Sequence, residues 1–142
     1  MKKLLFAGLL PFCLSLSCMG QAHQPPWPKH IEPPTYPHLA VIGRVSGKVE
    51  LTVAIDSDGR VTDVKVTNED ERFVKTFLEK AAVENIRRWT FTKPETAPAF
   101  QNVTYVFQID KTLPVTYPNE SFVEFDLPDR VTVRTNLPVA MP

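Results

Sequence analysis

The feature that most constrains the fold of this chain is a strict alternation of apolar and polar residues over 47–55, followed at once by a turn signal. Alternation with a period of two places one set of side chains on each face of an extended strand. The apolar set is Val49, Leu51, Val53 and Ile55. Asp58-Gly59 comes next, and glycine tolerates the positive φ that a tight hairpin turn requires. A return strand over 60–67 completes a predicted β-hairpin.

A stripe of apolar residues at helical spacing follows the hairpin and predicts one long helix packed across the sheet. The members of the stripe are Val74, Phe77, Leu78, Ala81, Ala82, Ile86 and Trp89. Asn68 is the expected N-cap of this helix, with Glu71 three residues on in a capping-box arrangement. Arg87 and Arg88 suit the negative end of the helix dipole, and Pro94 excludes a continuation.

Alternation returns in three segments nearer the C-terminus. Residues 102–109 predict a third strand, and residues 121–126 and 130–135 predict a further hairpin around the turn at 127–129. One face of the third strand carries Val103, Tyr105, Phe107 and Ile109. The expected fold class is α+β: a small antiparallel sheet in the order strand, hairpin, strand, helix, strand, with one helix packed on it and a C-terminal β-hairpin extension.

Residues 1–22 have the pattern of an export signal. Two lysines precede an apolar stretch over 4–16, and small residues precede a predicted cleavage point after Ala22. Because a spanning helix needs about 20 apolar residues, this shorter stretch favours a cleaved signal peptide and a periplasmic protein. Two alternatives stay open: a retained anchor, which would place the chain at the inner membrane, and a lipoprotein attached at Cys18.

Cysteine and charge content narrow the class of protein further. Both cysteines, Cys13 and Cys18, lie in the predicted signal, so the mature chain would have no disulfide, as suits a bacterial periplasmic protein. The chain has 16 basic and 16 acidic side chains, and loss of Lys2 and Lys3 would leave a net charge of −2. We therefore expect no nucleic-acid partner, and contact with the membrane only if the N-terminal segment is retained.

Proline marks the boundaries of the expected domain. Nearly all of the 14 prolines lie at 25–37 or 94–142, so 23–37 is predicted to be an extended, proline-rich lead-in. Regular structure is expected over 38–110 as one domain, with 111–142 as a C-terminal extension. Trp27, between two prolines, is either an exposed contact point or a residue that pins the lead-in to the domain.

No constellation of residues points to catalysis or metal binding. The mature chain would lack cysteine, and no serine lies in a recognisable nucleophile turn. His23, His30 and His38 are seven and eight residues apart in extended chain, which is not the spacing of a compact metal site. We expect no enzyme activity, no cofactor and no metal, and we expect Trp89 and Phe91 to be core residues.

Several short motifs follow one another in an order that is more specific than any of them alone. They are Tyr36-Pro37, Gly47, the alternating positions to Val53, Asp58-Gly59-Arg60-Val61, Phe73, Ala81 and Arg87-Arg88-Trp89-Thr90-Phe91. This set, which covers about 33–110, resembles the C-terminal domain of the TonB family, the periplasmic end of bacterial energy transducers.

The resemblance implies that the chain binds an extended segment of an outer-membrane TonB-dependent receptor or another envelope protein, in support of energy-dependent transport. In that family the segment adds as a strand to the edge of the sheet, and backbone hydrogen bonds give the affinity. The implied edge strand here is 102–109. The implied receptor-binding residues are Tyr36, Pro37, Val103, Thr104, Tyr105, Val106, Phe107, Gln108 and Ile109.

Two features depart from the family. The first is the lead-in, which reaches only about 45 Å and is too short to cross a periplasm, so we do not expect force transduction by this chain alone. The second is the tail 111–142, which continues past the usual end of the family domain. Because exposed edges are often blocked, we hypothesise that the 121–135 hairpin lies against 102–109 and gates peptide binding.

An alternative function also stays open. The chain would then be a structural or assembly module of the cell envelope that pairs through its sheet edge, as a homodimer or within a complex, with no transport role.

Overall fold

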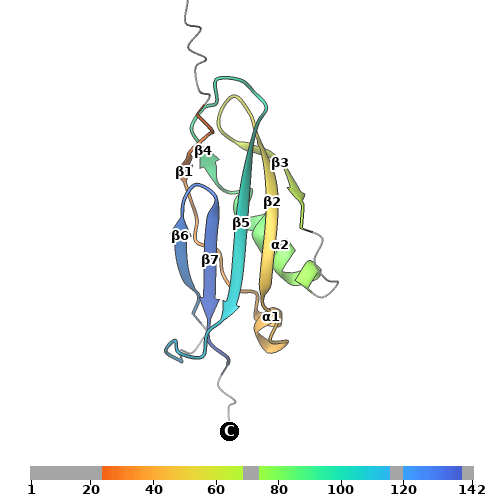
Figure 1. Ribbon diagram of the computed structural model, residues 1–142, viewed down its shortest axis with the longest axis vertical. Helices are drawn as coiled ribbons and strands as arrows, with labels where there is room; N and C mark the ends of the chain where they lie inside the picture. Colours follow the sequence, from red (N-terminus) through yellow and green to blue (C-terminus); the bar gives the residue numbers. More distant parts are fainter. Residues whose placement is uncertain (1–23, 69–73, 116–119, 139–142) are drawn as a thin grey trace, which may run out of the picture.

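The computed structural model describes residues 24–68, 74–115 and 120–138 of the chain. They form a main sheet with one long helix across one face, and a short helix lies beside one end of the sheet (Figure 1). The elements in chain order are β1 (Pro28–His30), α1 (His38–Ile42), β2 (Gly47–Ile55), β3 (Val61–Val66), α2 (Val74–Ile86), β4 (Thr90–Phe91), β5 (Ala99–Ile109), β6 (Phe122–Asp126) and β7 (Arg130–Thr135).

The main sheet has five strands in the order β3-β2-β5-β7-β6. The β3–β2, β2–β5 and β7–β6 ladders are antiparallel, whereas β5 and β7 run parallel. The predicted α+β class, with its packed helix and its added C-terminal hairpin, is confirmed. The sheet is mixed rather than wholly antiparallel, because the C-terminal hairpin joins β5 in the parallel direction.

The β2–β3 hairpin forms where alternation predicted it, and the core face of β2 is buried. That face consists of Val49, Leu51, Val53 and Ile55. In the turn, Asp56 Oδ1 accepts hydrogen bonds from the N–H groups of Asp58 and Arg60, both at 2.9 Å. Gly59 has a φ of 82°, and an added Cβ would lie 2.1 Å from the carbonyl oxygen of Phe91. Glycine is therefore needed at this position for both conformation and space.

Helix α2 carries the predicted apolar stripe. Leu78, Ala82 and Ile86 are fully buried against the sheet, and Trp89 is buried just beyond the end of the helix. Phe77, one turn before Ala81 on the stripe, keeps 39% of its surface exposed. The stripe thus gives the correct face for the helix, and Phe77 lies at the partly exposed margin of that face.

The predicted start of the helix is corrected at Asn68. Its side-chain Oδ1 accepts a hydrogen bond from the Glu50 N–H at 3.1 Å, and its Nδ2 donates to the Lys48 carbonyl oxygen at 2.6 Å. The amide group therefore extends the pairing of β3 with β2 and does not cap a helix. The rest of the predicted first turn, 69–73 with Glu71, lies outside the described residues.

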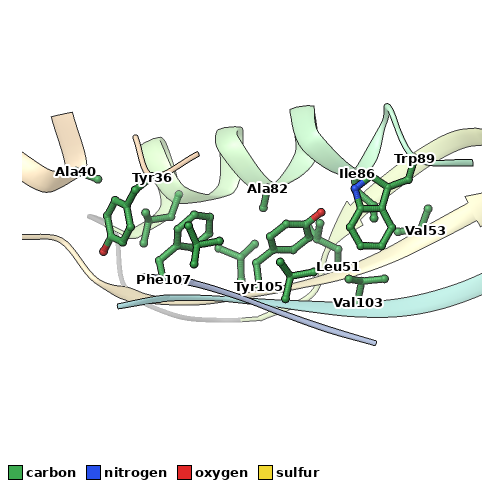
Figure 2. Packing of buried hydrophobic residues seen from close by; sticks show 14 of the residues in the cluster. Tyr36, Ala40, Leu51, Val53, Ala82, Ile86, Trp89, Val103, Tyr105 and Phe107 are labelled. Atoms are coloured by element: carbon green, nitrogen blue, oxygen red, sulfur yellow. The ribbon is translucent and has the colours of Figure 1, made fainter. Parts of the chain in front are cut away.

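A row of aromatic side chains fills the space between α2 and the sheet (Figure 2). The rings of Tyr36 and Phe107 meet edge to face with centroids 5.4 Å apart, and Phe107 stacks on Tyr105 at 6.3 Å. Trp89 lies 6.4 Å from Tyr105 and 6.2 Å from Phe125 of β6. The prediction that Trp89 belongs to the core is confirmed, and the row joins the lead-in, α2, β5 and β6 in one apolar layer.

The proline-rich lead-in is extended, as predicted, and backbone pairing ties it to the domain. Strand β1 pairs with β4, whose Phe91 is buried as expected. The Trp27 N–H donates to Thr92 Oγ1 at 2.9 Å, and the Trp27 carbonyl oxygen accepts from the Thr92 N–H at 2.8 Å. The Trp27 side chain remains half exposed. Its backbone therefore pins the lead-in while its indole stays accessible.

The short helix α1 was not predicted from the sequence. It begins after Pro37, which occupies the N-cap position, and it buries Ala40 and Val41. Leu39 and Ile42 remain exposed. Five residues make too few turns for a helical period to be recognised, so contacts with the rest of the fold decide the conformation of this segment.

Strand β5 is central in the sheet, and this corrects the expectation that 102–109 forms an edge. It starts at Ala99, earlier than predicted, because β2 pairs with residues 99–107 of it. On the other side of β5, β7 pairs with residues 104–109. The expected contact between the C-terminal hairpin and this strand is thus confirmed, whereas its role as a gate stays a prediction.

Candidate functional site

Tyr36, the first of the residues expected to bind a receptor, is a core residue. Its hydroxyl donates a hydrogen bond to the Val45 carbonyl oxygen at 2.6 Å, and its ring packs on Phe107. Burial raises the pKa of Tyr36 to about 12, so the hydroxyl stays a neutral donor near neutral pH. The Tyr36 N–H donates to Ser121 Oγ at 2.8 Å. Tyr36 therefore connects the lead-in to β5 and to the residue before β6.

Pro37 is one of the residues that line a surface groove between the lead-in, α1 and α2. The groove has a volume of about 380 Å³. Its apolar lining includes Pro33, Pro34, Leu39 and Phe77, and its charged lining includes Lys80, Glu84 and Arg88. Since Arg88 pairs with Glu32 at 3.3 Å and Lys80 lies 4.0 Å from Glu84, the rim presents both signs of charge. The groove thus has no clear charge preference for a partner.

The seven expected residues of β5 divide between two faces of the sheet. Those on the core face are Val103, Tyr105, Phe107 and the half-buried Ile109, and those on the outer face are Thr104, Val106 and Gln108. The structure brings Tyr36 beside Phe107 but keeps both rings inside the core. Because β7 pairs with 104–109 and β2 pairs with 99–107 on the opposite side, an added strand cannot join β5 at 104–109 while β7 is in place.

Asn85, a buried polar residue of α2, was missed by sequence reasoning. Its Oδ1 accepts hydrogen bonds from Trp89 Nε1–H at 3.0 Å and from the Tyr105 hydroxyl at 2.7 Å. Its Nδ2 donates to the Glu32 carbonyl oxygen at 3.0 Å. One amide group thus satisfies two buried donors and holds the lead-in against α2. The sequence signal was weak: an asparagine one turn before a core tryptophan.

The β6–β7 hairpin closes the core beside β5. Val131 and Val133 of β7 are fully buried, and burial of two such side chains contributes about 3–6 kcal/mol. The Thr104 N–H donates to the Asp129 carbonyl oxygen at 2.7 Å, and the Asp110 N–H donates to that of Thr135 at 2.8 Å. A hairpin held at both ends and in the middle is an integral part of this fold.

Arg134 links the hairpin electrostatically to the end of β5. Its guanidinium lies 3.1 Å from a Glu124 carboxylate oxygen and 3.8 Å from one of Asp110. Hydrogen bonds from the hydroxyl and N–H of Thr112, with a smaller contribution from Arg134, hold the pKa of Asp110 below its usual value. All these groups are in contact with solvent, so their attraction is screened and the link is a weak one.

Two strands of the described sheet, β3 and β6, pair on one side only. The β2–β3 ladder has a register shift beside Ile55, and the outer face of β3 carries Asp63 and Lys65. A bulge and a lysine both discourage further pairing at an edge. In contrast, β6 pairs with β7 in continuous register and carries Glu124 and Asp126 on its outer face. The more regular of these two edges is therefore the acidic one.

Across residues 24–68, 74–115 and 120–138, no three His, Cys, Asp or Glu side chains are grouped so as to hold a metal ion. No helix in those same ranges combines the length and the hydrophobicity needed to cross a bilayer.

Comparison with known proteins identifies the region that contains most of this sheet. Residues 32–111 match the family model described as Gram-negative bacterial TonB protein C-terminal. The matched range includes β2, β3, α2 and β5 and ends before β6. The C-terminal hairpin thus lies outside the residues that match the family.

Two curated relatives and one solved structure are similar to parts of this chain. The TonB proteins of two strains of Xanthomonas campestris pv. campestris, B100 and ATCC 33913, are each 36% identical to this chain over 63 residues, 44% of this chain and 27% of the relative. The chain thus spans about a quarter of the length of these curated relatives. The solution NMR structure of the Pseudomonas aeruginosa TonB C-terminal domain superposes with a TM-score of 0.49 at 24% identity, covering 61% of this chain and 88% of that one.

Proposed function

The chain belongs to the family of Gram-negative bacterial TonB protein C-terminal domains, and from this we propose that it is a periplasmic binding module for an outer-membrane TonB-dependent receptor. In this role it takes up an extended segment of the receptor by strand addition, as part of energy-coupled transport. Strand addition draws affinity from backbone hydrogen bonds and selectivity from alternate side chains. It requires an ordered sheet with an open edge rather than a catalytic group.

The observation that carries the proposal is the family match over 32–111 on a sheet whose outer strands in the described residues pair on one side only. The sheet is supported from one face by α2 and the aromatic row, and its other face is mostly polar, with the exposed Phe100 on β5. Such a sheet is ordered before any partner arrives, so the partner segment alone bears most of the ordering entropy on binding. This favours recognition of a flexible, extended segment.

The residues expected to bind the receptor take a supporting role in this proposal. Strand β7 occupies the place beside 104–109 that an added strand would take, so direct pairing with β5 requires release of the hairpin. With the hairpin in place, Val103 to Ile109 and Tyr36 hold the centre of the sheet, and the added strand joins an outer strand. Pro37 lines the groove and is partly exposed, so it remains accessible to a partner.

An amide NMR titration tests the proposal. The full chain, as purified from the cell envelope, is titrated with synthetic peptides that copy the periplasmic N-terminal segments of outer-membrane receptors of the same organism. We expect saturable shifts that follow one strand of the sheet. Scrambled peptides of the same composition are the matched control, and equal binding of both sets, or no saturable shift, would contradict the proposal.

Sedimentation separates this function from the assembly alternative. Pairing of the sheet edge with a second copy would give a dimer that persists on dilution and that excludes the receptor peptides. A monomer over the concentration range of the titration supports receptor binding, whereas a tight dimer that receptor peptides do not dissociate supports the assembly role.

A further inference from the structure

Resting on the function proposed above, we propose that β6 is the docking strand and that its partner is an extended segment in which basic side chains alternate with apolar ones. Strand β6 is the outermost strand beyond β7, and among the described strands it pairs with β7 alone (Figure 1). It also lies outside the residues that match the family. The C-terminal hairpin thus covers the edge of β5 with β7 and presents β6 as a new edge of the sheet.

The side chains of β6 face two environments. Val123 and Phe125 lie opposite buried valines of β7 and pack against the core while remaining partly exposed. Glu124 and Asp126 are exposed on the outer face. Because opposite residues of neighbouring strands share a face, with Cβ atoms about 4.5–5.5 Å apart, an added strand places alternate side chains beside each pair. Apolar residues of the added strand are favoured beside Val123 and Phe125, and cationic residues are favoured beside Glu124 and Asp126.

The charges at this edge are acidic where a partner would meet them. The Glu124 side chain is 69% exposed even though it pairs with Arg134. Asp126 and Asp129 are also exposed. The neighbouring cations, Arg130 and Arg134, belong to β7, one strand further into the sheet. A strand that approaches β6 from the open side therefore meets carboxylates first, and lysine or arginine is the complementary choice.

The same charges disfavour a second copy of this chain as the occupant. An antiparallel two-fold pair of β6 strands in full register places Glu124 opposite its own copy. The registers on either side place Glu124 opposite Asp126, or Asp126 opposite Glu120. Like charges directly opposite each other destabilise a strand pair. Each of these registers thus carries a repulsion that a basic partner turns into an attraction.

The opposite edge of the sheet is less suited to the same partner. Strand β3 pairs with β2 through a register shift, which bends the strand locally. Its outer face carries Asp63 and Lys65, one charge of each sign. A basic segment would be attracted by Asp63 and repelled by Lys65, so the two effects offset each other. Strand β3 therefore provides a natural control for the charge preference of β6.

The test uses two synthetic peptides on the full chain: one in which lysine alternates with valine, and a control in which glutamate replaces lysine. Amide NMR reports the affected strand and the affinity together. We expect the lysine peptide to shift the amides of 122–126 and to bind about tenfold more tightly at low salt, since two exposed charge pairs change sign between the peptides. The difference shrinks as salt is added.

Matched charge reversals on the two edges sharpen the test. Asp126→Lys on β6 is expected to weaken the lysine peptide about threefold and to strengthen the glutamate peptide. Asp63→Lys on β3 is expected to leave both affinities unchanged. Both side chains are exposed and neither is in an ion pair among the described residues, so both variants are expected to keep the fold.

Distinct outcomes separate this inference from the function on which it rests. If receptor peptides bind with shifts on β3, or with loss of the contacts between β5 and β7, the β6 assignment is overturned and receptor binding stands. If the glutamate peptide binds as tightly as the lysine peptide, the charge preference is overturned. If neither receptor peptides nor the lysine peptide bind saturably, both proposals fall.

Discussion

The two hairpins that flank β5 are built on the same alternation, yet they join the sheet differently. The β2–β3 hairpin pairs antiparallel with β5 and lies inside the family-matched region, whereas the β6–β7 hairpin pairs parallel and lies outside it. Their inner strands are equally deep, since Val53 and Val133 are both fully buried. Their outer strands differ: β3 is bulged and carries mixed charge, and β6 is regular and acidic.

The comparison shows that a segment outside a family's common region can complete the core as fully as a segment inside it. The side chains of β7 continue the apolar layer that β2 and β5 begin, and Phe125 extends it to Trp89. Because β7 occupies the edge of β5, the outer strand on this side of the sheet is β6. The docking role proposed for β6 is thus coupled to the structural role of the hairpin.

Removal of the hairpin is the change with the largest expected effect. A chain that ends at Leu113 loses Phe125, Val131 and Val133 from the apolar layer. At about 1.5–3 kcal/mol for each buried side chain, the loss is comparable with the whole stability of a typical domain. We expect urea unfolding, followed by tryptophan fluorescence, to lose its cooperative transition. An unchanged midpoint would show that the hairpin is an appendage.

The two turns should differ strongly in their tolerance of alanine. Gly59→Ala places a Cβ at positive φ and against the Phe91 carbonyl group, and we expect it to lower the free energy of unfolding by about 3 kcal/mol. Asp129→Ala in the other turn removes an exposed side chain and keeps the carbonyl oxygen that pairs with Thr104. Its effect should stay within about 0.5 kcal/mol. Equal effects in urea titrations would contradict the difference between the turns.

Matched valine truncations compare the two inner strands directly. Val53→Ala in β2 and Val133→Ala in β7 each remove two buried methyl groups, and each should lower the free energy of unfolding by about 2 kcal/mol. The measurement is the shift in urea midpoint at constant slope. A negligible effect of Val133→Ala beside a full effect of Val53→Ala would place β7 outside the cooperative core.

Tyr36 connects β5 with the start of the added hairpin and should make stability sensitive to alkali. Because its folded pKa of about 12 lies above the ordinary 10.0, the stabilisation by its neutral form is complete below pH 10 and is lost as the pH rises toward 12. Tyr36→Phe should flatten the alkaline part of the curve of unfolding free energy against pH. It should also lower the free energy of unfolding at neutral pH by about 1 kcal/mol, because the Val45 carbonyl group loses its hydrogen bond.

Two further residues, Tyr105 and Ser121, serve to check the alkaline effect. Tyr105 contributes to the same loss, because burial also raises its pKa, so the flattening is expected to be partial. Ser121→Ala removes the acceptor of the Tyr36 N–H and leaves the phenol untouched. A profile of Ser121→Ala as flat as that of Tyr36→Phe would contradict the assignment to the phenol.

Asp110, at the end of β5, should give the smallest effect. Its pKa is lowered by hydrogen bonds from Thr112 and by Arg134, so its contribution to stability is present above its usual pKa and is lost as the pH falls through the folded value. Thr112→Val should raise the pKa of Asp110 toward normal, measured by NMR titration of its carboxyl group. A larger rise in Arg134→Met than in Thr112→Val would reverse the order of the two causes.

The sequence predicted the faces of the strands, the Asp58-Gly59 turn, the apolar stripe of α2 and the existence of the last hairpin. Each of these depends on residues close together in the chain. The start of the helix at Asn68 was misassigned because a distant strand, β2, offered its side chain better partners than a helix end. Helix α1 and the role of Asn85 were missed because neither has a repeat that a pattern could reveal.

The sequence by itself determined which side chains of each strand and helix are apolar, and where the chain reverses, because period and glycine conformation are local properties. The tertiary structure alone decided which strand lies beside which. It placed β7 rather than a partner along β5, and it joined Tyr36 to Ser121, 85 residues apart. Alternation tells a strand which face to bury but not which neighbour to pair with, and that choice sets where this protein has an open edge.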